Sequence, residues 1–271
     1  MKVIKLFTKQ SNRQIVECHS LNLLRGYGIE GDSNACAGSP RQLLLVDQPT
    51  LKQFDLQPGD LSENILVDTS LQSLESGTVL RVGNALVRLT FLCEPCSKLE
   101  SLRQGLAKAI KGRRGILGMV VKSGVVTVED AIAPTPYTLP ALSEDVKSRF
   151  QEFVARIPAG KVVTTVDLLL ALGVANAYYR VIPIFIKNAP ASLPLHRIVS
   201  VDGKLLTPHI PDQLQKLVWE GVKVEPERMD ASPIRASDID TERSLNPAKH
   251  TDWFIRYRWA PEQFHDLGNF L

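Results

Sequence analysis

The sequence has no long hydrophobic run and little cysteine, and each absence excludes a class of protein. No apolar stretch approaches the roughly 18 residues that a membrane span needs, and residues 1–5 lack the apolar core of a signal peptide. Four cysteines in 271 residues show no pairing pattern typical of a secreted disulfide scaffold. These absences predict a cytoplasmic protein with no membrane contact.

The sequence also has little excess charge of either sign. Its formal net charge is +3 with a pI near 8.6, which permits contact with nucleic acid without arguing for it. A content of 44% hydrophobic and 23% charged residues is that of a globular protein. At 271 residues the chain is long enough for two domains, each with its own core.

Metal-binding patterns are scarce as well. Cys93 and Cys96 form a CxxC, but neither a second CxxC nor a His-x3-His follows, so a zinc site is not expected. A redox pair is the alternative for this motif. We interpret Cys93 as a small buried apolar residue. Pro95 cannot donate to a strand ladder, so Cys96 is expected to emerge where the sheet stops, as an accessible thiol.

What is present in the first half is typical of a β-barrel. Residues 77–90 are β-branched and aliphatic on both sides of Gly83-Asn84, which predicts a hairpin. Other short strands are expected within residues 1–16, 42–46 and 64–67, with Gly, Pro and Asp between them. Residues 99–110 carry apolar side chains at helical spacing, which predicts one helix that Gly112 ends.

Five motifs follow one another in this half of the chain. They are Gly31-Asp32, Arg41-Gln42-Leu43-Leu44-Leu45-Val46, Pro58-Gly59-Asp60-Leu61-Ser62-Glu63-Asn64-Ile65, Glu94-Pro95-Cys96 and Arg114-Gly115-Ile116. In this order they resemble the MOSC domain, which is similar to the C-terminal part of molybdenum-cofactor sulfurases. One departure is Ser33-Asn34, where many relatives have a histidine after the Gly-Asp pair.

The resemblance implies a β-barrel with a cleft into which Cys96 points. It implies that Cys96 is the catalytic residue, which carries sulfur or ligates the molybdenum of a pterin cofactor as a soft thiolate. The cofactor-binding residues that it implies are Cys96, Asp32, Arg41, Asn64 and Arg114. The basic cluster Lys108, Lys111, Arg113 and Arg114 has two interpretations: it binds the phosphate of a pterin cofactor or of pyridoxal phosphate, or it is a solvated helix end.

A proline-rich stretch divides the chain. Residues 133–140 contain three prolines and predict a stiff, extended connection. We therefore expect a barrel over residues 1–135, a linker over 136–142, a mainly α helix-turn-helix, winged-helix-like domain over 143–224, and a C-terminal extension over 225–271. A helix that Ser143-Glu144-Asp145 caps is expected to end before Ile157.

Residues 164–180 predict two short helices around a tight turn at Gly173, the pattern of a helix-turn-helix. The surrounding motifs resemble the DNA-binding domain of O6-alkylguanine-DNA alkyltransferases; they are Ile157-Pro158-Ala159-Gly160-Lys161-Val162, Arg180, Asn188, Pro194-Leu195-His196-Arg197-Ile198-Val199, Asp202-Gly203 and Glu220-Gly221-Val222. Leu195 stands where that family has its nucleophilic cysteine. Leucine has no nucleophilic atom, so this position cannot accept an alkyl group.

The resemblance then shifts to the alkyltransferase-like proteins, which bind alkylated DNA without repairing it. It implies contact with duplex DNA containing alkylated guanine through Thr165, Arg180, Leu195, His196 and Arg197, without any cofactor. Arg180 matches the arginine that fills the gap left by a flipped base. Thr165 replaces a tyrosine and Pro183 a small residue of that family. A repair or redox protein is a further expected partner.

The last segment is the least informative. Residues 253–259 interleave aromatic residues with arginines, which suits stacking on bases, but we interpret them as packing on a domain. For the whole chain we expect molybdenum-cofactor or sulfur-carrier chemistry at Cys96 coupled to recognition of alkylated guanine. The alternatives are a non-enzymatic lesion sensor with a structural barrel, and a reductase of N-hydroxylated substrates with a vestigial second domain.

Overall fold

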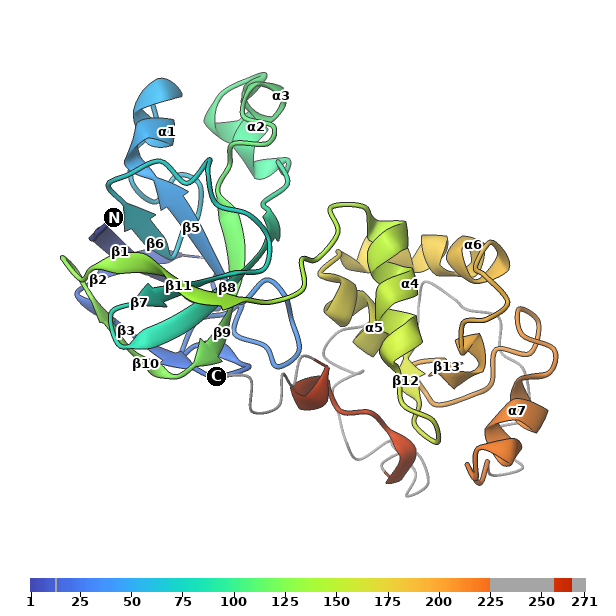
Figure 1. Cartoon of the computed structure of the whole chain (residues 1–271). Helices are drawn as coiled ribbons and strands as arrows, with labels where there is room; N and C mark the ends of the chain where they lie inside the picture. The colour runs from blue at the N-terminus through green and yellow to red at the C-terminus, as the bar shows by residue number, and fades with distance from the viewer. Residues whose placement is uncertain (13, 225–255, 265–271) are drawn as a thin grey trace. The chain divides into compact units, whose positions relative to one another are not determined.

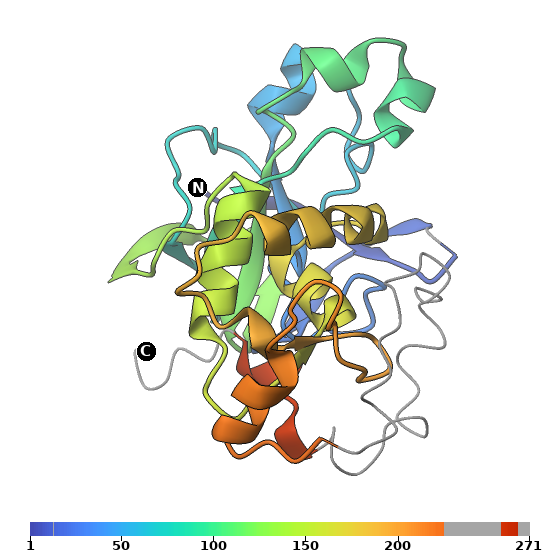
Figure 2. The same ribbon diagram turned by 90° about the vertical axis from the view of Figure 1, so that its right-hand side faces the viewer.

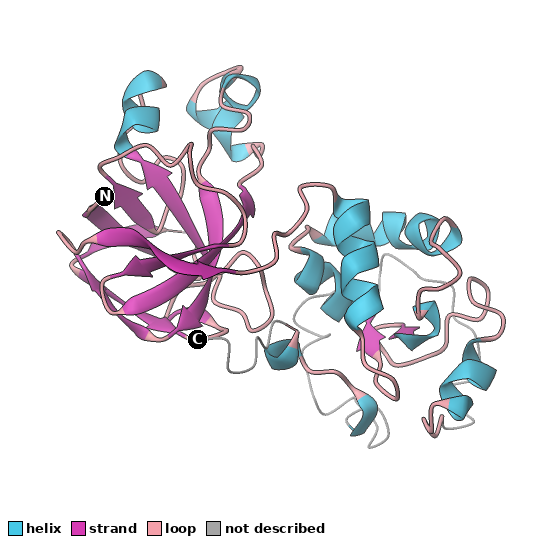
Figure 3. Ribbon diagram, in the orientation of Figure 1, coloured by secondary structure: helices cyan, strands magenta, loops and turns pink. Residues whose placement is uncertain are grey.

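The computed structural model describes residues 1–12, 14–224 and 256–264 (Figure 1). Contacts divide the chain into two compact units, Met1–Glu144 with His265–Leu271, and Asp145–Phe264. Strands dominate the first unit and helices the second (Figure 3). None of the described helices is by itself long and apolar enough to cross a membrane; Thr165–Leu172 and Asn176–Lys187 reach that length only together, with a bend of 116° between them.

Two sheets form the first unit. The larger has eight strands in the order β11-β7-β8-β9-β5-β6-β1-β2, and the smaller has the order β10-β3-β4. The strands are β1 (Val3–Lys9), β2 (Ile15–Cys18), β3 (Ser20–Leu24), β4 (Gly28–Ile29), β5 (Leu43–Asp47), β6 (Ile65–Val67), β7 (Thr78–Val82), β8 (Ala85–Leu92), β9 (Ile116–Lys122), β10 (Gly124–Thr127) and β11 (Ile132–Thr138).

Neighbouring strands of these sheets are antiparallel except β5 and β6, which pair in parallel with Leu45 opposite Ile65. The expected hairpin is confirmed, with Val82 opposite Ala85 across Gly83-Asn84. Apolar side chains from both sheets form one core, among them Leu6, Leu43, Leu23 and Val126. Burial of this core between the sheets is the main source of stability of the first unit.

Three short helices lie at one end of the strands of this unit (Figures 1 and 2). They are α1 (Gln48–Gln53), α2 (Lys98–Leu102) and α3 (Leu106–Ala109). The single helix expected over residues 99–110 is therefore wrong: Gly105 lies between two helices with φ +79°, a left-handed conformation that glycine adopts without a steric cost. Leu99, Leu106 and Ile110 are still buried, which explains the helical spacing in the sequence.

The proline-rich stretch is partly a strand. Residues 132–138 form β11, an edge strand of the larger sheet, and pair with β7 through Ile132, Ala133 and Pro134. An edge position tolerates proline because only one side of the strand needs backbone donors. The segment after Thr138 stays attached to the first unit, since Leu139 donates to the carbonyl of Gly77 and Arg88 donates to that of Pro140.

The second unit is mainly helical. Its elements are α4 (Val146–Arg156), β12 (Val163–Thr164), α5 (Thr165–Leu172), the 3-10 helix η1 (Asn176–Val181), α6 (Ile182–Lys187), the 3-10 helix η2 (Leu195–Arg197), β13 (Ile198–Val199), α7 (Gln213–Trp219) and the 3-10 helix η6 (Pro261–Gln263). In its described residues the strands β12 and β13 pair in parallel. The wing of a winged-helix domain, an antiparallel hairpin, is not found in this described part.

Local signals in the sequence explain the helix ends here. Asp145 caps α4 through a hydrogen bond from the Ser148 N–H, as the sequence predicts. Thr164 and Asp167 form a capping box at the start of α5, and Gly173 ends this helix with φ +64°. Pro183 lies at the start of α6, where proline is tolerated because this position has no helical hydrogen bond to lose.

The end of the chain contributes to the core of the second unit. Trp259 is buried and its ring lies 5.4 Å from that of Phe153, while Phe264 packs edge-on against Phe153 at 5.0 Å. Arg258 forms an ion pair with the buried Asp167. The interpretation that the aromatic residues of this segment pack on a domain is thus confirmed for Trp259; residues 253–255 lie outside the described residues.

Candidate functional site

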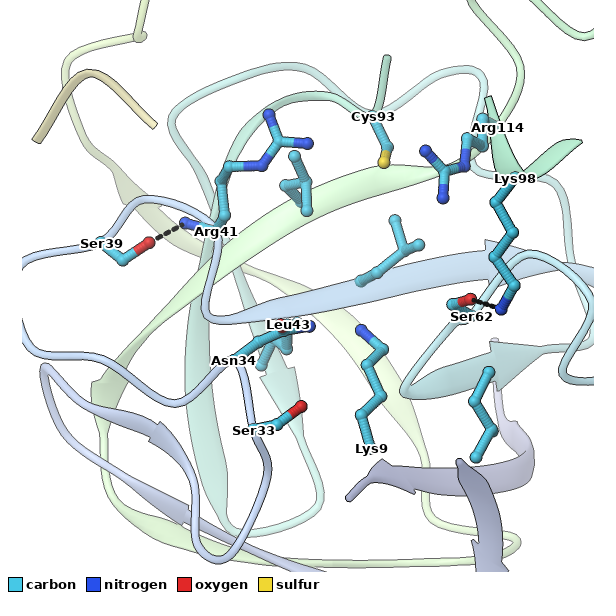
Figure 4. Close-up of a pocket in the computed structure, with 13 residues that line it drawn as sticks. Lys9, Ser33, Asn34, Ser39, Arg41, Leu43, Ser62, Cys93, Lys98 and Arg114 are labelled. Atoms are coloured by element: carbon cyan, nitrogen blue, oxygen red, sulfur yellow. Dashed lines mark hydrogen bonds between the residues drawn. The ribbon is translucent and has the colours of Figure 1, made fainter. Parts of the chain in front are cut away.

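A polar cavity of about 460 Å³ opens in the first unit (Figure 4). Its wall combines basic side chains, hydroxyl and amide groups, and one thiol. The residues come from the end of β1, the start of β2, β5 and the loop before it, the loop before β6, the segment after β8 with the start of α2, and β9 with the segment before it. They are Lys9, Ile15, Ser33, Asn34, Ser39, Arg41, Leu43, Leu44, Ser62, Cys93, Lys98, Arg114 and Leu117.

Two arginines of the cavity are held through the same residue, Glu94. Arg41 donates from Nη1 to Glu94 Oε2 at 2.7 Å, and its guanidinium lies 5.6 Å from the centre of the Phe91 ring. Arg114 donates from Nη1 to the Glu94 carbonyl at 2.6 Å and from Nη2 to the Leu61 carbonyl at 3.4 Å. The Nε of Arg114 is buried without a hydrogen-bond partner among the described residues. Both guanidinium groups are therefore positioned before any ligand binds.

Gly115 is required for the position of Arg114. Its φ is +107°, and a Cβ at this residue would lie 2.3 Å from the carbonyl oxygen of Leu45 in β5. Any side chain would therefore push the segment away from the sheet. In the pair Arg114-Gly115, the arginine is a cation of the cavity, and the glycine lets this segment of the backbone approach the sheet closely.

Lys9 enters the cavity from β1, opposite the two arginines (Figure 4). Its Nζ donates to Asn64 Oδ1 at 3.1 Å, and Asn64 Nδ2 donates to Asp32 Oδ2 at 2.8 Å and to the Phe7 carbonyl at 3.2 Å. Asp32 also accepts from the Lys9 backbone N–H at 2.8 Å. Burial lowers the pKa of Lys9, while the Asp32 carboxylate acts in the opposite direction.

Asp32 and Asn64 lie behind the wall of the cavity, and their expected contact with a cofactor stays a prediction. Both are buried, and neither belongs to the cavity lining in the part of the chain that the structure describes. Asn64 additionally accepts from the Leu44 N–H at 3.1 Å, and Asp32 from the Asn34 N–H at 2.8 Å. They position Lys9 and the loop that carries Ser33 and Asn34.

A second carboxyl group lies near Lys9. Glu63 is buried, and its Oε1 accepts from the Gly59 N–H at 2.6 Å while Oε2 has no hydrogen-bond partner among the described residues. Burial raises the pKa of Glu63, although the Gly59 N–H and the nearby Lys9 charge lower it. Beside it, Lys98 donates to Ser62 Oγ at 2.7 Å.

The two cysteines of the CxxC have different environments. Cys93 is buried, as expected, yet its sulfur points into the cavity between Arg41 and Arg114 (Figure 4). Burial raises the pKa of the Cys93 thiol, although Arg114 and Arg41 lower it. Cys96 is exposed and is not part of the lining in the described residues. Of the expected site residues, the cavity brings together Arg41 and Arg114 and leaves Cys96 outside.

Sequence reasoning missed Lys9, Ser62, Cys93 and Lys98 as members of this site. The signal for Lys9 was a charged residue at the end of a strand whose apolar positions are buried. The signal for Cys93 was its position directly after β8, where it alternates with the exposed Leu92, combined with the two arginines that precede and follow it in the motifs. Lys98 and Ser62 come together only through the fold.

In the second unit, α5 and the following segment Asn176–Lys187 meet at 116°, an angle typical of helix-turn-helix motifs. Arg180 and Tyr178 are exposed on η1. Thr165 is fully buried, because the first turn of α5 packs into the core. Its expected contact with DNA stays a prediction.

A hydrogen-bonded cluster surrounds Glu220 in the same unit. Glu220 accepts from Arg197 Nη2 at 2.6 Å and from the Gly160 N–H at 2.9 Å, and it contacts His196 Nε2 at 2.8 Å. Arg197 also donates from Nη1 to the Ile157 carbonyl. Burial raises the pKa of Glu220, but Arg197, Gly160 and His196 together lower it to about 2. Leu195 and His196 are half-buried.

Comparison with known families finds one match, which lies within the first unit. Residues 37–133 match the MOSC domain. Similar solved structures include YiiM from Escherichia coli, at a TM-score of 0.42 and 18% identity over 66% of this chain and 90% of that one. YuaD from Bacillus subtilis is similar at a TM-score of 0.41 and 20% identity, over 48% of this chain and 93% of that one. YiiM from Geobacillus stearothermophilus is similar at a TM-score of 0.40 and 14% identity, over 80% of this chain and 98% of that one. No curated protein matches the chain.

Proposed function

We propose that the cavity of the first unit binds a phosphate-bearing organic ligand, and the match of residues 37–133 to the MOSC domain makes the molybdenum-pterin cofactor the leading candidate. The observation that supports this is the convergence of Lys9, Arg41, Lys98 and Arg114 on one cavity. Guanidinium and ammonium groups held in place before binding favour phosphate, because charge-assisted hydrogen bonds are stronger than neutral ones.

The residues present fit the phosphate of such a cofactor. Arg41 and Lys98 lie at the cavity wall with side chains that reach solvent, and the unpartnered Nε of Arg114 adds a buried donor. Pyridoxal phosphate carries the same anionic group and is the second candidate. When bound, a molybdenum cofactor supplies redox or sulfur-transfer chemistry; the chain's own residues would bind its phosphate and orient it.

The thiol that faces a bound ligand is Cys93 in this proposal. Cys96, the expected catalytic cysteine, is exposed and accessible to a sulfur donor or a redox partner protein. A sulfur-carrier role for Cys96 remains a prediction that Cys96→Ala tests. Loss of bound sulfur in Cys96→Ala and its retention in Cys93→Ala would support that prediction, and the reverse result would transfer the role to Cys93.

Ligand binding is tested with inorganic pyrophosphate and with the isolated molybdenum-pterin cofactor, by equilibrium binding at stated salt. Arg41→Gln and Lys98→Met each remove one cavity cation, and we expect an increase in Kd of about tenfold or more, since a hydrogen bond to a charged group contributes about 1.5–3 kcal/mol. Lys108→Met is the matched control, because Lys108 is exposed and lies outside the lining. Equal effects of all three changes would reject the cavity as the binding site.

For the second unit we propose binding of duplex DNA through η1 and α6. The observation that favours it is that Arg180 and Tyr178 are exposed on the segment Asn176–Lys187, which meets α5 at 116°. Recognition of alkylated guanine is the finer form of this proposal. Duplexes with and without one O6-methylguanine, titrated at stated salt, test it: preference for the lesion that Arg180→Ala removes supports it, and equal affinity for both duplexes rejects lesion recognition.

A further inference from the structure

We infer that Lys9 is a carbonyl-reactive amine, which forms an imine with an aldehyde or ketone that carries a phosphate or carboxylate group. The inference rests on the proposed function, because the anion is held by the cations of the same cavity. Lys9 precedes the residues that match the MOSC domain, so the similarity does not account for it.

The position of Lys9 carries the argument. Among the described residues, its ammonium group is the cavity cation whose environment is built from buried polar side chains: Nζ donates to Asn64, and Asn64 is fixed by Asp32 and by backbone groups on β1 and β5. An amine held by one neutral acceptor keeps its remaining valences directed toward the cavity.

Charges around Lys9 act in both directions. The pKa of Lys9 is raised by three nearby groups that can be negative, those of Asp32, Cys93 and Glu63. It is lowered by the positive charge of Arg114. Burial dominates these influences and lowers the pKa of Lys9, so a larger share of the amine is neutral at a given pH. Only the neutral amine is a nucleophile, and each pH unit of lowering increases its share about tenfold.

The reaction balances without a further reactant. The nitrogen lone pair of neutral Lys9 attacks the carbonyl carbon, the carbonyl oxygen takes a proton, and the carbinolamine then loses water to give the C=N bond. No atom changes its oxidation state. Loss of water requires a proton donor, and Glu63 lies close enough for its charge to act on Lys9, with a raised pKa from burial and a buried Oε2 without a partner.

Chemical trapping tests the inference on the full chain. The wild-type protein is mixed with a slight excess of pyridoxal 5′-phosphate as the probe, borohydride is added to reduce the imine to a stable secondary amine, and the modified lysine is identified by peptide mass spectrometry. We expect a dominant adduct at Lys9 that inorganic pyrophosphate competes away. Modification spread over exposed lysines, or concentrated at Lys98, would overturn the inference.

Two variants sharpen the result. Lys9→Arg keeps a cation in the cavity but cannot form an imine, so we expect the adduct to fall to the level of the exposed lysines. Lys52→Arg is the matched control, because Lys52 is exposed on α1 and lies outside the lining. Absence of pyrophosphate binding to the wild type would reject the proposed function. Normal pyrophosphate binding without an adduct at Lys9 would reject this inference alone.

Discussion

The cluster around Glu220 makes a quantitative prediction for the second unit. In Glu220→Gln the guanidinium of Arg197 loses its carboxylate partner, while Gln keeps nearly the same size and can still accept from the Gly160 N–H. The side chains of Arg197 and Glu220 are only 15% and 16% exposed, so solvent replaces the lost interaction poorly. We therefore expect the change to destabilise this unit through electrostatics rather than through packing.

The magnitude follows from the pKa of Glu220. A fall from 4.5 to about 2 corresponds to about 3 kcal/mol of stabilisation of the ionised form, at about 1.4 kcal/mol per pH unit. Residual solvent at the cluster reduces this figure, so we expect a loss of about 2 kcal/mol for Glu220→Gln at pH 7. Because the pKa is lower in the folded state, the stabilisation is present above pH 4.5 and is lost as the pH falls toward 2.

Tryptophan fluorescence during urea unfolding measures this effect selectively. All three tryptophans, Trp219, Trp253 and Trp259, fall within residues 145–264, so the signal reports on the second unit. We expect a lower midpoint for Glu220→Gln than for the wild type at pH 7, and a difference that shrinks as the pH falls from 4.5 toward 2. The control Asp212→Asn removes an exposed carboxylate of the same unit and should leave the midpoint nearly unchanged. Equal midpoints of Glu220→Gln and wild type at pH 7 would refute the reasoning.

Two further predictions concern the first unit. Iodoacetamide should modify Cys96 faster than Cys93 at pH 8, because Cys96 is exposed whereas burial raises the pKa of Cys93; quantitative peptide mass spectrometry measures both rates, and equal rates would contradict the assignment of Cys93 to a buried wall. Gly115→Ala should destabilise the first unit by about 3 kcal/mol or more, because its Cβ would clash with the Leu45 carbonyl and its φ is positive. Thermal unfolding followed by circular dichroism checks this, and an unchanged midpoint would show that the segment shifts without cost.

Much of the local structure could be predicted from sequence because the deciding interactions are local. The hairpin at Gly83-Asn84 and the ends of α4 and α5 depend on turn and capping residues within a few positions of one another. The break between α2 and α3 was missed because apolar spacing continues through Gly105. There the conformation of a single residue outweighs the periodicity of its neighbours.

The site was predictable only in part. Arg41 and Arg114 are cavity residues as expected, whereas Asn64 lies beneath the wall because its amide completes the hydrogen bonds of β1 and β5. The face on which a residue after a strand emerges depends on the strand's register, so the choice between Cys93 and Cys96 could not be made from the sequence. Lys9 and Arg114 are more than 100 positions apart in the chain and meet only through the pairing of distant strands.

The packing of Trp259 and Phe264 against Phe153 has a consequence for biosynthesis. Every described strand of the first unit is complete by residue 138, so its sheets can form while the ribosome is still adding the rest of the chain. The second unit differs, because its core contains residues translated more than 100 codons after Phe153. Until residues 259–264 leave the exit tunnel, α4 exposes an apolar surface, and a nascent chain stalled before residue 259 would present this surface to chaperones.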